Sequence, residues 1–482
     1  MTKGFKFLVI GICAVAVPVA FSQPIGSPMT FIEDTPTYAE AGLVPLHTEV
    51  PMMLGQTSND DREQKLCVLD NGTTAVFWVN RGGSHHVNGM DRLGNRIFPV
   101  FEDGGAADVI VGINTAGTNT NWTLCKNKRG ENKFLAAATY LAGTLAGSNA
   151  EIPETVIDAD GIVQDGGQGH GFFMLFNENL LSESVPMSIS QFSAGHRDWD
   201  CCWLNNGNFV IVTNCQNHRY EGDPDYDASN NKVATINIFD SFGTRVKDEF
   251  FTNDVTGKQE AVRCGALANG FVVMFSDSNN GVTAEFYDNN GNFTKSVFPI
   301  VDSALNRPAS WMEACGGDTW ITVHEGATIP DGFAQLPELA GVTVVLAQLW
   351  NTSGDPIGPP ILVSQHNLTR GLGRNRVAMA PNGSFVVSWS DKVADDVSFL
   401  EVMVARVFNA DGTPATDAFI PHNLPEVENP MTGGPGQPMP GMNNEFVAFA
   451  WSSKAFSGNS DSVLSVFPNP AEGTGVSDWE LH

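Results

Sequence analysis

A hairpin pattern that recurs along the whole chain constrains the fold more than any other feature. Its clearest copy is in residues 374–423, where Phe385, Val387 and Trp389 alternate with smaller or polar residues after a turn at Gly383. Alternation with a period of two is typical of a strand that is buried on one face. A second hairpin follows in the same stretch, so the sequence predicts a unit of four short antiparallel strands. A sheet this small cannot bury both of its faces alone and needs neighbours of the same kind.

Both hairpins recur often enough to supply those neighbours. The first hairpin recurs at residues 66–78, 124–138, 202–212, 264–277, 314–323 and 442–453. The second occurs seven times, from MDRLGNRIFPV (90–100) to VFPNPAEGTGVSDWEL (466–481). A four-stranded repeat of roughly fifty residues fits a blade of a β-propeller. The sequence therefore predicts an all-β fold, a β-propeller with four antiparallel strands per blade and seven blades, with six or eight as alternatives.

The N-terminal region differs from the repeats. Lys3 and Lys6 precede an apolar run too short to span a bilayer, and Ala20-Phe21-Ser22 suits cleavage, so residues 1–22 are predicted to be a signal peptide. The protein is then secreted, to the periplasm, the cell surface or the medium, and no later stretch predicts membrane insertion. Residues 23–65 form an extension ahead of the propeller at 66–482. Within it, residues 40–52 either form a strand that closes the ring beside the last blade or belong to an eighth, partial blade.

The balance of charge excludes some partners. The chain has 26 Lys and Arg against 54 Asp and Glu, and its formal net charge is −28. Nucleic acids and anionic membranes attract clustered basic residues, so neither is an expected partner. An acidic coat suits a soluble extracellular protein whose partner is a glycan or another protein.

Insertions are confined to one end of the predicted blades. Turns after the first and third strands are tight, as in DNG, NNG, PNG, DSFG and DNNG. Long insertions follow the second strands, at residues 139–171, 213–232 and 324–341, and lie at the opposite end of each blade. Loops held by a rigid scaffold are where binding sites usually lie. The sequence thus predicts one plain face and one functional, loop-bearing face.

Links that enter the first strand of each blade converge on the loop-bearing face, near the axis. They carry arginines, tryptophans and acids at recurring positions, and we take as candidates for ligand binding Arg62, Trp122, Arg197, Asp198, Trp199, Arg263, Arg307, Trp311, Glu313 and Arg376. Arginine and aromatic side chains at a concave mouth suit a carboxylate or a sugar ring. The alternative is structural: each arginine pairs with an acid of the next blade, and each tryptophan packs between blades.

Cysteines also recur at one point of the first strand, at Cys67, Cys125, Cys201, Cys202, Cys264 and Cys315. Packing of a small side chain explains this placement, and disulfides are the alternative in an exported protein. Soft metal ligands gather at His196, Cys201, Cys202, Cys215 and His218, in no standard spacing. Asp158, Asp160 and Asp165 resemble a calcium loop without the EF-hand spacing, so calcium is the one cofactor that the sequence leaves open.

Catalytic motifs are missing: the sequence has no GxSxG, no phosphate-binding loop and no dinucleotide fingerprint, and it identifies no catalytic residue. Residues 382–414, with NGSFVVSWSD and VARVFNADGTP, resemble the repeats of secreted bacterial β-propeller proteins of uncharacterised role. That resemblance extends over nearly the whole mature chain, although this blade matches best, and it implies a fold rather than an activity. Sialidases are another propeller family, but their SxDxGxTW box is absent, and CGGDTW at 315–320 is only a partial match.

Three functions are consistent with these features, and one of them is a self-assembling structural protein. The favoured one is a binding or assembly module that recognises a glycan or protein through its loop-bearing face. The alternative is a propeller hydrolase or lyase that acts on an acidic polysaccharide at the arginine and tryptophan mouth.

Overall fold

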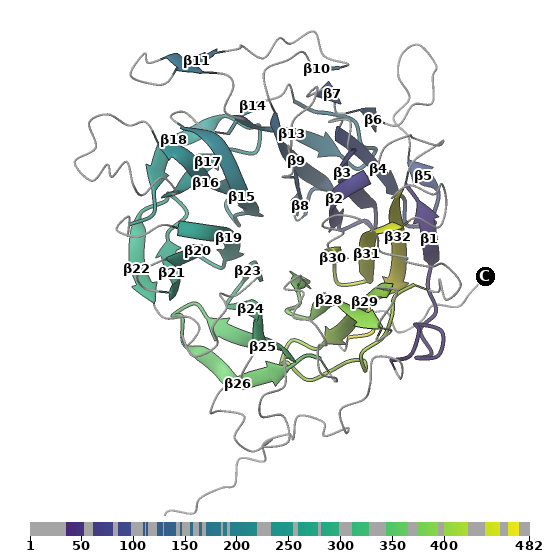
Figure 1. Ribbon diagram of the computed structural model, residues 1–482. Coiled ribbons are helices and arrows are strands. Elements are labelled where there is room, and N and C mark those ends of the chain that lie inside the picture. Colours follow the sequence, from purple (N-terminus) through teal and green to yellow (C-terminus); the bar gives the residue numbers. More distant parts are fainter. Residues whose placement is uncertain are drawn as a thin grey trace, which may run out of the picture.

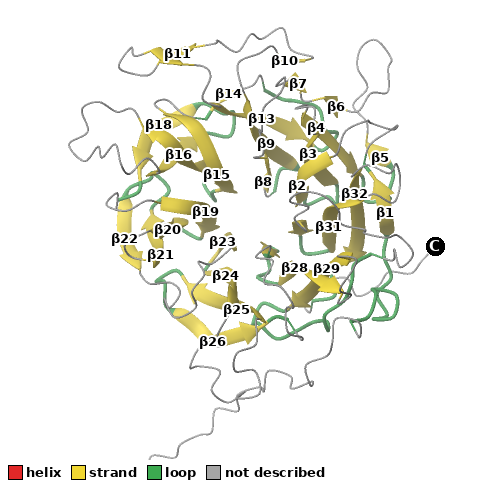
Figure 2. Ribbon diagram, in the orientation of Figure 1, coloured by secondary structure: helices red, strands yellow, loops and turns green. Residues whose placement is uncertain are grey.

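A computed structural model gives the fold, and every regular element that it describes is a β-strand (Figure 2). The described residues are 35–52, 61–80, 85–97, 109–110, 112–113, 123–128, 130–140, 145–146, 155–157, 163–165, 170–184, 187–189, 193–218, 233–253, 259–277, 281–297, 311–326, 344–364, 375–393, 400–422, 439–453 and 461–471. No helix within these ranges could cross a bilayer. The predicted signal peptide, residues 1–22, lies outside them.

Most strands form antiparallel sheets of sequence neighbours. The first sheet holds β2 (Asp61–Val68), β3 (Thr74–Asn80), β4 (His85–Met90) and β5 (Arg96–Ile97), with β6 (Val109–Ile110) also on β4. The second holds β8 (Thr123–Lys128), β9 (Lys133–Tyr140), β13 (His170–Asn177) and β14 (Met187–Ser188). The third holds β15 (Ser193–Trp203), β16 (Phe209–His218), β17 (Val233–Phe239) and β18 (Arg245–Phe251).

Later sheets repeat this order. The fourth holds β19 (Gln259–Leu267), β20 (Gly270–Asp277), β21 (Gly281–Tyr287) and β22 (Phe293–Val297), and the fifth β23 (Trp311–Gly317), β24 (Thr319–Gly326), β25 (Val344–Asn351) and β26 (Pro356–Leu362). The sixth holds β27 (Arg376–Met379), β28 (Phe385–Val393) and β29 (Leu400–Phe408), and the last β30 (Met439–Met442), β31 (Phe446–Ser453), β32 (Asp461–Pro468) and β1 (His47–Pro51). Two small ribbons pair β7 (Gly112–Ile113) with β10 (Leu145–Ala146) and β11 (Thr155–Ile157) with β12 (Val163–Asp165).

The sheets stand around a common axis (Figure 1). The first strand of each sheet lies nearest the centre, and outer strands such as β18, β22 and β26 lie at the rim. One pair of neighbouring inner strands, β19 and β23, pairs briefly in parallel through Ala266 and Cys315. This arrangement confirms the predicted all-β propeller fold, whereas the number of blades stays a prediction.

The core lies between neighbouring sheets. Four tryptophans on second strands, Trp78, Trp320, Trp389 and Trp451, are fully buried. Strand alternation gives each sheet two apolar faces, and each face packs on the next sheet. The inner strands therefore present their edges and a few side chains to the axis.

Tight turns join the first strand to the second and the third to the fourth, as the sequence predicts. In the outer turn of the fourth sheet, the Asp288 carboxylate accepts the N–H groups of Asn290 and Asn292 at 2.8 and 2.9 Å. Gly291 closes the turn at a φ of 75°, where glycine is favoured because it has no Cβ. A Cβ at Gly291 would lie 2.6 Å from Ile238 Cδ1 of the third sheet. The turn therefore packs on the preceding sheet.

A strand from the N-terminal extension completes the last sheet. β1 pairs antiparallel with β32, and the Tyr38 N–H donates to the Ile420 carbonyl at 2.9 Å. Of the two alternatives for residues 40–52, the strand beside the last sheet is the one observed, and β2 begins at Asp61, ahead of residue 66. The domain boundaries as a whole stay predictions.

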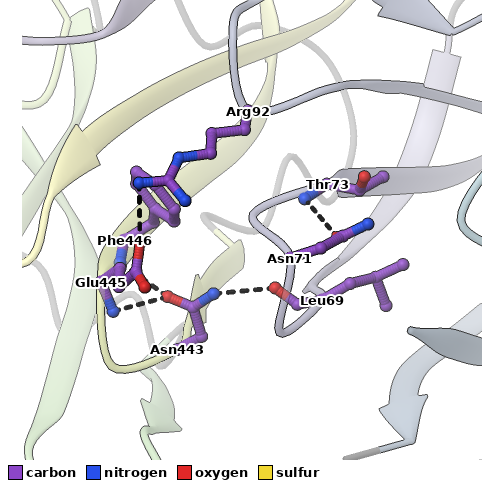
Figure 3. A network of polar contacts seen from close by, with 7 residues as sticks. All are labelled: Leu69, Asn71, Thr73, Arg92, Asn443, Glu445 and Phe446. Carbon is purple, nitrogen blue, oxygen red and sulfur yellow. Dashed lines mark hydrogen bonds and ion pairs between the residues drawn. The ribbon is translucent and has the colours of Figure 1, made fainter. Parts of the chain in front are cut away.

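Polar contacts join the first and last sheets (Figure 3). The Asn443 side-chain amide donates to the Leu69 carbonyl at 2.7 Å. Arg92 pairs with Glu445 at 3.2 Å, and its guanidinium lies 5.6 Å from the centre of the Phe446 ring. Contacts between segments more than 350 residues apart in the sequence thus hold the ring closed.

Candidate ligand-binding site at the propeller axis

A narrow cavity, with about 70 Å³ of space for water-sized molecules, lies at the axis. Its walls are residues of the inner strands β2, β8, β15, β19, β23, β27 and β30. Because first strands line the axis, the residues at the start of each one lie toward the end at which the sequence predicts the long loops; most residues of those loops lie outside the described ranges. Trp311, the first residue of β23, is one of them.

Among the side chains that the structure describes, six inner strands each carry a charged one that is buried or nearly so: Lys65, Lys126, Asp200, Arg263, Glu313 and Arg376. Four of these groups are basic and two are acidic, although the chain as a whole has a formal net charge of −28. Taking a charge out of water is costly unless an opposite charge or several hydrogen bonds compensate it. Basic groups thus outnumber acidic ones among these six described side chains.

Bulges shape three of these inner strands. The pairing register shifts between Arg62 and Lys65 in β2, between Arg197 and Asp200 in β15, and between Glu260 and Arg263 in β19. A bulge inserts one residue and redirects the side chains that follow it. In each strand the first paired residue after the bulge is a buried charged residue.

Arg263 and Arg376 both lie over the indole of Trp311. Their guanidinium carbons are 4.1 and 4.2 Å from the ring centre, within the range of a cation–π contact. All three side chains are at most 7% exposed. Arg263 Nη1 donates to the Val262 carbonyl at 2.6 Å, but the buried Arg263 Nε has no acceptor among the described residues. Arg263 also forms no ion pair with any described residue.

Lys126 and Glu313 form an ion pair across the axis, between β8 and β23. Burial alone would lower the pKa of Lys126, but the neighbouring negative charges of Glu313 and Asp200 raise it well above its usual value. The Asp200 carboxylate also accepts the backbone N–H groups of Cys201 at 2.9 Å and Cys264 at 3.1 Å. This buried network holds β8, β15, β19 and β23 together.

The described cysteines are buried thiols. Cys67, Cys201, Cys202, Cys264 and Cys315 are free, and no disulfide joins any described pair. Burial raises the pKa of the Cys201 and Cys264 thiols well above the usual value, so they stay protonated and unreactive. Packing, rather than reactivity, accounts for these positions.

Four of the predicted binding residues come together: Trp311 and Glu313 line the cavity, and Arg263 and Arg376 lie against Trp311 without lining it. Trp199 instead packs between the second and third sheets, with its ring 2.6 Å from where a Cβ of Gly171 would be. Packing between blades is the structural alternative that the sequence left open for this tryptophan. Arg62, Arg197 and Asp198 lie in β2 and β15, and their side chains are outside the described parts of the chain. Trp122 and Arg307 are outside them altogether.

Lys65 and Lys126 line the same cavity but are not singled out by the sequence. Each lies in a first strand within two residues of a recurring cysteine, which is the signal that would have identified them. The Lys126–Glu313 contact joins residues 187 positions apart, and such a pairing follows only from the closed ring.

The candidate metal ligands do not form a described site. β15 and β16 place His196 opposite Cys215 and Ser193 opposite His218, but no described group of three His, Cys, Asp or Glu side chains is arranged to hold an ion. Asp165 ends β12, and Asp158 and Asp160 lie outside the described residues. Calcium binding by that segment stays a prediction.

Comparisons with known proteins show likeness of fold alone. No protein-family model matches the chain, and no curated protein does. Among solved structures, polysaccharide lyase Uly1 aligns at a TM-score of 0.45 and 9% identity, over 85% of this chain and 90% of that one. A protein of unknown function from Dyadobacter fermentans aligns at 0.43 and 9%, over 89% and 99%. The α-L-arabinofuranosidase Arb93A from Fusarium graminearum aligns at 0.37 and 9%, over 88% and 98%.

Proposed function

We propose that the protein is a secreted or cell-surface binding module, and that it takes an acidic glycan at the loop-bearing end of the propeller axis. The group recognised there is a carboxylate. Arg263, Trp311 and Arg376 are the residues that we expect to bind it.

The buried guanidinium of Arg263 is the observation that carries this proposal. It is 6% exposed, and the described residues supply one acceptor, the Val262 carbonyl. A guanidinium offers five N–H donors in a fixed fork, which matches the two oxygens of a carboxylate. An acidic ligand that contacts the guanidinium would neutralise its charge.

Trp311 keeps the guanidinium groups in place. Both arginines stack on its ring, so little side-chain freedom remains to be lost when a ligand binds. Two positive charges against one indole also favour an anion over a neutral sugar. The site is thus arranged in advance for negative charge.

Glu313 is the residue that bears on the alternative function, a hydrolase or lyase. It is a carboxylate that lines the axial cavity, and hydrolysis or eliminative cleavage of an acidic polysaccharide would require such a group. However, its oxygen is engaged by the Lys126 ammonium, which keeps it from acting readily as a proton donor or acceptor. We therefore favour binding without turnover.

The test is a glycan array of acidic and neutral polysaccharides, probed with the wild-type protein and two variants. Arg263→Met removes the proposed contact. Arg92→Met is the control, since the Arg92 side chain is 44% exposed and lies between the first and last sheets, away from the cavity. Both variants are checked for the wild-type circular dichroism spectrum.

Acidic glycans are expected to bind, and Arg263→Met is expected to weaken them at least about 30-fold, because losing one partner of a buried charged contact costs about 2 kcal/mol or more. Arg92→Met should bind as the wild type does. Equal binding of neutral and acidic glycans would contradict the proposal. Release of cleavage products without a stable complex would establish the enzyme instead.

A further inference from the structure

Two cysteines of neighbouring inner strands face each other. Cys202 lies in β15 and Cys264 in β19, and these first strands of the third and fourth sheets are side by side (Figure 1). Both side chains are at most 4% exposed and pack into the same apolar cluster between the two sheets. Cys201 instead packs on the other side of β15, in the cluster between the second and third sheets. Of the two adjacent cysteines in β15, Cys202 is therefore the one that faces Cys264.

Two further contacts bring this pair together. The carboxylate of Asp200, two residues before Cys202, accepts the backbone N–H of Cys264 at 3.1 Å, so one side chain spans the gap between the strands. The thiol groups of Cys202 and Cys264 are also hydrogen-bonded to each other. A disulfide requires side chains that point toward each other from closely spaced segments of main chain. The inner strands β15 and β19 meet both conditions.

We propose that Cys202 and Cys264 form a disulfide as the chain folds after export, and that this bond ties the third sheet to the fourth at the axis. The predicted signal peptide leads to the oxidising compartment that such a bond needs. The disulfide is independent of glycan binding, although it would also fix β19, the strand that carries Arg263.

The oxidant is an external disulfide, either of a small molecule or of a protein. One cysteine thiolate attacks it and forms a mixed disulfide, and the second thiolate then displaces the external sulfur. The pair loses two protons and two electrons, and the external disulfide is reduced to two thiols. In the folded, reduced chain, burial and the neighbouring Cys202 raise the pKa of Cys264, which makes this exchange slow. The bond therefore forms before β15 and β19 close on each other.

The experiment is peptide mapping of the full chain after its export to a bacterial periplasm. The protein is alkylated in denaturant without reductant and then cleaved after lysine and arginine. Cys202 then lies in the peptide 198–219 and Cys264 in the peptide 264–295. We expect mass spectrometry to find these two peptides covalently joined, and dithiothreitol to separate them. If Cys202 and Cys264 are both fully alkylated, after export and also after refolding with oxidised glutathione, the proposal is overturned.

Single variants identify the bonded cysteine within the peptide 198–219. Cys201→Ala is the matched control, because Cys201 is adjacent to Cys202 and is also buried. This variant should keep the joined peptides, whereas Cys202→Ala and Cys264→Ala should lose them. Joined peptides in Cys202→Ala would assign the bond to another cysteine and would also overturn the proposal.

Reduction of the wild-type protein gives a readout on stability. A disulfide restricts the unfolded chain, and the effect is larger for a long loop such as the one between these two strands. Dithiothreitol should therefore lower the thermal unfolding temperature of the wild type and of Cys201→Ala by about 5 °C, and it should leave that of Cys264→Ala unchanged. An equal fall in Cys264→Ala, or no fall in the wild type, would contradict a bond between the third and fourth sheets.

Discussion

Breaking the Lys126–Glu313 pair from either side should destabilise the protein unequally. Lys126→Met leaves Glu313 and Asp200 as neighbouring buried carboxylates without their shared cation. Glu313→Gln leaves Lys126 with the attraction of Asp200, which contributes to its raised pKa. We therefore expect Lys126→Met to be the more damaging of the two.

The magnitude follows from burial. With side-chain exposures of 17% and 13%, the pair is closer to a buried salt bridge than to a surface one, and removing one partner of a buried pair typically costs about 3 to 5 kcal/mol. We expect that cost for Lys126→Met and about 1 to 3 kcal/mol for Glu313→Gln. The double variant should be less unstable than the sum of the two, with a coupling of about 1 to 3 kcal/mol.

Urea unfolding followed by tryptophan fluorescence and circular dichroism measures these differences, provided that the two signals change together. Thermal unfolding gives the same ranking independently. If Glu313→Gln proved the more damaging change, or if the cycle showed no coupling, the two side chains would not be paired across the axis.

Three further predictions concern the scaffold. Gly291→Ala should destabilise the protein by about 1 to 3 kcal/mol more than Gly207→Ala. Both residues have positive φ, but only a Cβ at Gly291 would meet a neighbouring sheet. Equal midpoints of unfolding for the two variants would contradict this packing. Burial lowers the pKa of His422 from 6.5 to about 4. Between these two pH values the unfolded chain binds a proton at this histidine and the folded chain does not. The free energy of unfolding should therefore fall by about 3 kcal/mol as the pH drops from about 6.5 to about 4. His422→Gln should lose less stability over that interval in pH-dependent unfolding, and an identical loss would refute the assignment. Deleting residues 35–52 removes β1 and exposes the edge of β32. Light scattering should then show aggregation at a lower temperature than for the full chain. An unchanged aggregation temperature would mean that β1 does not close the ring.

Local patterns made the fold predictable from the sequence. Alternating apolar residues such as Phe385 and Val387 define strands, and turn glycines such as Gly291 fix where the chain reverses. Both signals depend on a few neighbouring residues. Repetition of the two together identifies the propeller.

The candidate site was only partly predictable, because side-chain direction depends on bulges. Trp199 and Trp311 occupy similar places in the sequence, yet Trp199 lies in a bulge of β15 and packs between sheets, whereas Trp311 lines the axis. The contact between Lys126 and Glu313 depends on how the ring closes. No local sequence pattern encodes either outcome.

The central claim is that Arg263 holds a carboxylate, and calorimetric titration with galacturonic acid and its methyl ester tests it most directly. The wild-type protein should bind the free acid at least about 10-fold more tightly than the ester, and Arg263→Met should bind both equally and weakly. Equal affinity of the wild type for acid and ester, or full discrimination by Arg263→Met, would contradict it.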